Sequence, residues 1–171
     1  YLFRVYGNNG KLIKQLEKVT TKKDSERANL VKSFAGGFET TLCPIGMVGF
    51  VHIMVVDQPQ VGFEIQFFPK DRDFQGWTYR TDPASKMTET AQFICADEKQ
   101  VLLQVLKRKS FLSSEIDAYL LGIDLATGKK KFEVLLRDSN NSFFLLNGLK
   151  DKTTGNCLLF GNFTAIGDHS L

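Results

Sequence analysis

The sequence predicts an all-β fold, and three observations support this class. Short apolar runs bounded by polar turns occur along the chain, as in residues 100–106 (QVLLQVL) and 157–163 (CLLFGNF). The 15 Phe residues are many for a chain of 171 residues, and aromatic side chains favour half-buried sheet positions. The strand–turn–strand pattern also recurs about every 55 residues, which is typical of a repeat architecture.

Hairpins of a first kind are expected at residues 1–19, 61–80 and 118–136. Their turns lie at residues 8–10, 70–73 and 126–128, where Asn, Asp and Gly favour tight turns. The turn centres are about 63 and 55 residues apart, a spacing that indicates one repeated unit.

Hairpins of a second kind alternate with the first. They are expected at residues 34–56, 90–109 and 142–163, with turns near residues 44–46, 97–100 and 151–155. Their centres are again about 52 to 55 residues apart, so both kinds of hairpin share one period.

A hairpin of the second kind followed by one of the first makes a unit of four antiparallel strands. Two such units are expected, at residues 34–81 and 90–138. A hairpin with a linker at residues 1–33 and a hairpin at residues 142–171 supply two half units. Four-stranded antiparallel units repeated in tandem are the blades of a β-propeller, and each needs neighbours to cover its faces.

The predicted fold is therefore a partial β-propeller of two full blades and two half blades. Since propellers typically have about four to eight blades, we expect the chain to belong to a longer protein or to be completed by other chains. A β-sandwich of the same strands is the alternative architecture. Only residues 24–34 have a helix start, and residues 110–117 are expected to form a loop.

Composition excludes several classes of function. A net charge of +3 is too small to indicate a nucleic-acid partner. The longest apolar stretch, residues 47–56, contains His52 and is too short to span a membrane, so no transmembrane segment is expected. No signal peptide or initiator Met is visible at Tyr1, and we expect the start of the chain to be trimmed.

The cysteines do not predict a metal site or a disulfide framework. Cys43, Cys95 and Cys157 are odd in number and have no paired spacing. Cys43 and Cys95 occupy equivalent positions in the repeat, so we expect buried thiols that behave as small apolar side chains.

The most specific local pattern runs from Gly122 to Gly128 and is followed by Phe132. Asp124 is placed to accept hydrogen bonds from turn amides, and Gly128 to adopt positive φ. This pattern resembles the repeat of quinoprotein-type propellers, Ala-x-Asp-x-x-x-Gly-x-x-x-Trp, in which the Trp docks one blade on the next. Gly122 stands for the Ala and Phe132 for the Trp, while Trp77 occupies the position of Phe132 in the preceding unit. The resemblance implies a structural blade turn with docking residues Asp124, Gly128, Phe132 and Trp77, and no cofactor.

The chain also resembles propeller-like secreted or envelope proteins of Bacteroidota. The resemblance lies in residues 77–79, residues 87–90 and the hairpin from Leu121–Asp124 to Phe132–Glu133. It implies a bacterial periplasmic, outer-membrane or cell-surface location and assigns no catalytic residue.

No catalytic site is predicted. The two histidines, His52 and His169, have no Gly-x-Ser-x-Gly motif to accompany them, and His52 is expected to be a partly exposed or hydrogen-bonded strand residue. In a propeller, several carboxylates could gather at a central pocket. The candidates are Asp57, Glu64, Glu89, Asp117 and Glu133. Two of them at a suitable separation would suit a glycosidase.

The leading functional hypothesis is a non-enzymatic propeller-type scaffold or binding module whose partner is a protein or further blades of the same protein. The alternative is a carbohydrate-active hydrolase or a sugar-binding propeller. For the latter, the exposed aromatics Trp77, Tyr79 and Phe74 would form the ligand platform. Neither a metal site nor a phosphate-binding loop is expected, because the oxygen-rich and glycine-rich stretches lack the required spacing.

Overall fold

The computed structural model of the chain describes residues 2–6, 10–17, 41–57, 61–70, 76–82, 84–109, 115–151 and 153–165. Within these ranges the chain forms twelve strands and no helix, so the all-β prediction is confirmed. The predicted helix at residues 24–34, most of the predicted loop at 110–117 and the turn at 71–73 lie outside the described residues.

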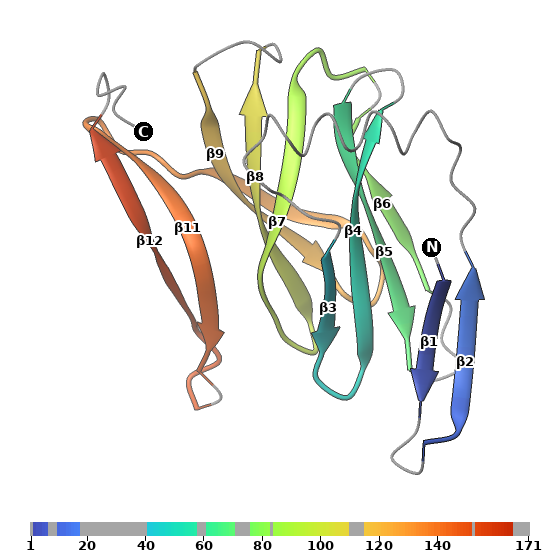
Figure 1. Ribbon diagram of the computed structural model, residues 1–171. Coiled ribbons are helices and arrows are strands. Elements are labelled where there is room, and N and C mark those ends of the chain that lie inside the picture. The colour runs from blue at the N-terminus through green and yellow to red at the C-terminus, as the bar shows by residue number, and fades with distance from the viewer. Residues whose placement is uncertain are drawn as a thin grey trace.

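The strands follow one another as antiparallel hairpins (Figure 1). The first six are β1 (Leu2–Tyr6), β2 (Leu12–Glu17), β3 (Thr41–Ile45), β4 (Gly49–Asp57), β5 (Val61–Pro69) and β6 (Thr78–Arg80). The second six are β7 (Thr88–Ala96), β8 (Gln100–Arg108), β9 (Asp117–Asp124), β10 (Lys130–Leu135), β11 (Asn141–Lys150) and β12 (Cys157–Ala165).

Four sheets result. The first sheet has the order β3-β4-β5-β6 and the second sheet β10-β9-β8-β7, each with neighbours in sequence paired antiparallel. Two two-stranded sheets flank them, the N-terminal hairpin β1-β2 and the C-terminal hairpin β11-β12. In Figure 1 the two hairpins lie at opposite ends of the molecule, with the two four-stranded sheets between them.

Two apolar layers hold the sheets together. The larger one joins the first and second sheets and includes Ile53, Ile65, Val101 and Leu103. The smaller one joins the second sheet to the C-terminal hairpin and includes Ile94, Cys95, Leu102 and Leu145. The second sheet is therefore covered on both faces, as one expects of stacked sheets that cannot shield themselves.

Strand β8 is a nearly continuous apolar run because both of its faces are covered. Successive side chains of a strand point to opposite faces, so Val101, Leu103 and Val105 face the first sheet while Leu102 faces the C-terminal hairpin. All four are buried, because both faces of β8 are covered.

The one polar residue in the middle of this run, Gln104, fixes the C-terminal hairpin on the second sheet. Its side chain is only 3% exposed. Gln104 Nε2 donates to the carbonyl oxygen of Leu145 (3.1 Å), and Leu145 N donates to Gln104 Oε1 (2.5 Å). The register of β11 and β12 is irregular between Leu145 and Asn147, so the contact falls beside a β-bulge.

Candidate functional site

Trp77, which immediately precedes β6, makes a contact between the first and second sheets. Its indole Nε1 donates to the carbonyl oxygen of Leu125 in the β9–β10 turn at 2.7 Å. The ring lies against Gly128, where a Cβ atom would be only 2.6 Å from Trp77 Cδ2. Phe67 packs against the same ring with centroids 5.5 Å apart. Trp77 and Gly128, both expected from the sequence to be docking residues, are thus in direct contact.

The turn that receives Trp77 is held by Asp124. Its Oδ1 accepts from the backbone N and from Oγ1 of Thr127, both at 2.9 Å. These hydrogen bonds hold the pKa of Asp124 below its ordinary value. Gly128 adopts a φ of 69° and donates its N–H to the Asp124 carbonyl at 2.8 Å. The positive φ and the close indole ring both require the absence of a side chain at position 128.

Phe132 of the second sheet corresponds to Trp77 of the first sheet, and it packs on the smaller apolar layer as Trp77 packs on the larger one. It pairs with Gly122 across β10 and β9, and a Cβ on Gly122 would lie 2.6 Å from Phe132 Cζ. Its ring packs on the smaller apolar layer with Leu145. Trp77 therefore contacts the layer between the first and second sheets, and Phe132 the layer between the second sheet and the C-terminal hairpin.

The aromatic residues expected to form a ligand platform are not all described. Phe74 lies outside the described residues. Tyr79 is half-buried and stacks on Phe63 with centroids 6.2 Å apart, and burial raises the pKa of its hydroxyl. Since Trp77 is also engaged in packing, binding of a sugar by this group remains a prediction.

Two of the five candidate carboxylates are brought together beside Lys107. Glu133 Oε1 lies 2.6 Å and Glu89 Oε1 4.0 Å from Lys107 Nζ, and the ammonium group lies 4.7 Å from the centre of the Tyr119 ring. Burial opposes ionisation of Glu133, but Lys107 and Lys130 outweigh it and lower the pKa of this carboxyl. A general acid needs the opposite shift, so Glu133 suits an ion pair with Lys107 better than proton donation.

The other candidates lie apart from this cluster. Asp117 is 3.8 Å from Arg137, and Glu64 accepts a hydrogen bond from Gln66 at 2.8 Å. The side chain of Asp57 is outside the described residues. His52 is fully buried on β4, which excludes the partial exposure expected for it, and His169 lies outside the described residues.

An open groove of about 830 Å³ lies where the second sheet meets the C-terminal hairpin. Its walls come from residues 96–100, from Lys131, and from Lys150, Asp151, Thr154 and Gly155 of the C-terminal hairpin. Lys150 Nζ crosses between the two elements to Asp97 Oδ2 at 2.5 Å. Burial raises the pKa of Asp97, but Lys150 and the amides of Lys99 and Gln100 outweigh this and lower it. No local sequence pattern predicts this contact, because the two residues lie in different repeats.

The outward side of the C-terminal hairpin is apolar and exposed. Gly148, Leu159 and Cys157 face the second sheet, and alternation therefore places Leu149, Leu158 and Phe160 on the opposite side. These three side chains, called here the outer apolar face, are 58%, 57% and 48% exposed.

The described residues thus define an antiparallel all-β protein in which four-stranded sheets stack through apolar layers. The chain belongs to a family of unknown function, DUF6770, whose model matches residues 2–169. No curated protein and no solved structure matches the chain. Across the described ranges no three metal-binding side chains gather at one point, and no helix long and apolar enough for a membrane span is found.

Proposed function

We propose that the chain is a segment of a β-propeller-type scaffold that binds a protein partner through the C-terminal hairpin. The observation that supports this function is the outer apolar face, formed by Leu149, Leu158 and Phe160, next to a strand edge. In line with the Bacteroidota resemblance, we place this scaffold in a bacterial envelope.

The stacking of sheets supports a propeller rather than a sandwich. In a sandwich of two sheets the outer faces are wet. Here each four-stranded sheet is made of consecutive strands, and the second sheet has Val101 buried on one face and Leu102 on the other. The contact of Trp77 with Gly128 resembles blade docking in quinoprotein-type propellers and supports the same arrangement.

The edge of β12 supports one kind of partner over others. In the four-stranded sheets the second strand, β4 or β8, is paired on both sides. Within the part of the chain described, β12 pairs only with β11, although it holds the same place in the repeat. Unpaired edges accept added strands, and an apolar face beside the edge adds specificity. The partner we propose is therefore a β-hairpin with an apolar side.

The chain itself contains a hairpin of this kind. The N-terminal hairpin is two-stranded and corresponds to the third and fourth strands of a full unit. Because it lies at the opposite end of the molecule (Figure 1), it does not pair with β12 of the same copy. A second copy of the chain is thus the partner to test.

The test is sedimentation velocity over a range of protein concentrations. We expect the unmodified chain to self-associate and the double variant Leu158→Lys/Phe160→Lys to be a monomer. Val134→Lys is the matched control, since Val134 is 54% exposed on β10 and lies outside the outer apolar face. A monomeric unmodified chain, or equal association of all three proteins, would contradict binding through this face.

A further inference from the structure

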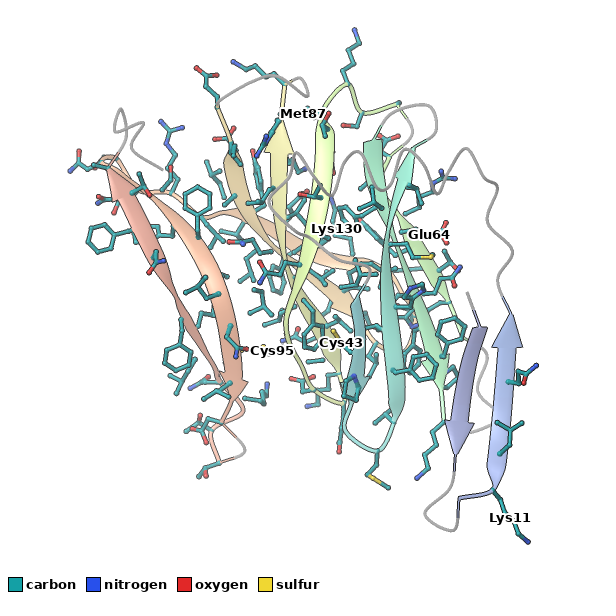
Figure 2. All side chains as sticks on the ribbon, in the orientation of Figure 1. Lys11, Cys43, Glu64, Met87, Cys95 and Lys130 are labelled. Atoms are coloured by element: carbon teal, nitrogen blue, oxygen red, sulfur yellow. The ribbon has the colours of Figure 1, made fainter. Side chains whose placement is uncertain are left out.

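Cys95 and Cys157 meet between the second sheet and the C-terminal hairpin. Cys95 lies on β7 and is buried, while Cys157 is the first residue of β12 and is half-buried. Both belong to the smaller apolar layer, and burial together with the neighbouring Cys157 side chain raises the pKa of Cys95. Of the two cysteines labelled in Figure 2, Cys95 on β7 belongs to the smaller apolar layer and Cys43 on β3 to the larger one.

The neighbouring residues leave space for the two thiols between the second sheet and the C-terminal hairpin. Gly148 on β11 faces Cys95, and a Cβ at that position would lie 3.1 Å from Cys95 Sγ and 2.9 Å from a methyl group of Ile94. The missing side chain therefore leaves room for sulfur between the sheets.

An ion pair fixes the same part of the interface. Lys150 is the register partner of Cys157, and Asp97 follows Cys95 by two residues. The Lys150–Asp97 contact at 2.5 Å thus runs beside the pair of thiols. The ion pair therefore joins the end of β11, the strand that pairs with Cys157, to the residue that follows β7.

We propose that Cys95 and Cys157 are a site of oxidative cross-linking and form a disulfide between the second sheet and the C-terminal hairpin. The oxidant is a low-molecular-weight disulfide such as oxidised glutathione. The inference is independent of the proposed function, because it concerns the inward side of the hairpin and not the outer apolar face.

The exchange proceeds in two steps. Cys157, the more exposed thiol, loses its proton, and its thiolate attacks one sulfur of the small disulfide, releasing one small thiolate. Cys95 then loses its proton and attacks Cys157 Sγ, which forms the protein disulfide and releases the second small thiolate. The two protein thiols lose two electrons to the small disulfide, and the two protons end on the two small thiols.

The electrostatics of Cys95 determine the order of attack. Burial, followed by the contact with Cys157, raises the pKa of Cys95 to about 12, so its thiolate is rare. Reaction therefore starts at Cys157, and Cys95 acts as the resolving thiol. Cys43 is buried in the other layer, where burial raises its pKa to about 11, and it serves as the internal control.

The test compares the whole chain after treatment with oxidised glutathione and after treatment with a dithiol reductant, both without denaturant. We expect a mass decrease of about 2 Da, a peptide pair linking Cys95 to Cys157, and a higher Tm in the oxidised protein. Cys43→Ser should form the same cross-link and Cys157→Ser should not. A stable glutathione adduct on Cys157 without a cross-link, or a cross-link to Cys43, would overturn the proposal.

Discussion

Replacement of Gly128 by Ala tests whether the contact of Trp77 with the β9–β10 turn joins the two sheets. Position 128 has a φ of 69°, and a side chain in this region costs about 1–2 kcal/mol. The new Cβ would also lie 2.6 Å from Trp77 Cδ2. Overpacking of this kind costs about 1–3 kcal/mol. We expect a total loss of about 3 kcal/mol, which lowers the Tm of a chain of this size by roughly 10 °C.

Gly155→Ala separates backbone strain from the clash. Gly155 has a φ of 73°, and a Cβ there would meet nothing within 4 Å. This variant should therefore cost only the strain, about 1–2 kcal/mol. The difference between the two variants measures the contact with the indole ring.

A double-mutant cycle completes the test. In a Trp77→Ala background the ring is gone, so Gly128→Ala should cost about as little as Gly155→Ala does. Urea unfolding followed by circular dichroism gives the free energies, because Trp77 is the one Trp of the chain and its fluorescence is lost. Gly128→Ala costing no more than Gly155→Ala, or costing the same with and without Trp77, would refute the docking contact.

Three further predictions concern the other contacts between sheets. Gln104→Leu should lower stability by about 2–4 kcal/mol in urea unfolding, because it leaves the buried N–H and C=O of Leu145 without their partner; an unchanged midpoint would contradict this. Asp97→Asn should flatten the acid side of the stability–pH curve. The pKa of Asp97 is lowered on folding, so its contribution is present above the ordinary value of 3.8 and is lost as pH falls through the folded pKa; unchanged pH dependence would count against the pair with Lys150. Phe132→Ala should cost about 2–4 kcal/mol from lost packing, and an unchanged Tm would show that its ring is not packed.

The sequence predicted the strands well because their signals are local. Apolar runs such as residues 100–106 and turn residues such as Gly128 determine a hairpin within about ten positions. The alternation of two hairpin kinds also predicted that Trp77 and Phe132 hold equivalent places. The structure adds that Trp77 reaches the turn at Gly128, a contact that spans most of one repeat.

Several contacts that the sequence did not reveal join different repeats. Gln104 gave no signal as a partner of Leu145, since a single polar residue in an apolar strand does not show what it faces. The spacing of Cys95 and Cys157 along the chain likewise says nothing about which faces of two sheets meet. Side-chain partners of this kind depend on sheet stacking and register, which no local pattern encodes.

The outer apolar face also restricts what can bind there. Leu149, Leu158 and Phe160 are already about half covered, so burying the rest of them contributes about 2–5 kcal/mol in total, whereas association itself costs about 4–15 kcal/mol in lost motional freedom. Side-chain burial on this face is therefore not enough for a stable complex. The backbone groups along the free edge of β12 must contribute as well, and only a partner in β conformation can pair with them. A helix laid on the same surface would bury the three side chains and leave the edge unpaired, which is why a β-hairpin is the partner that this end of the stack favours.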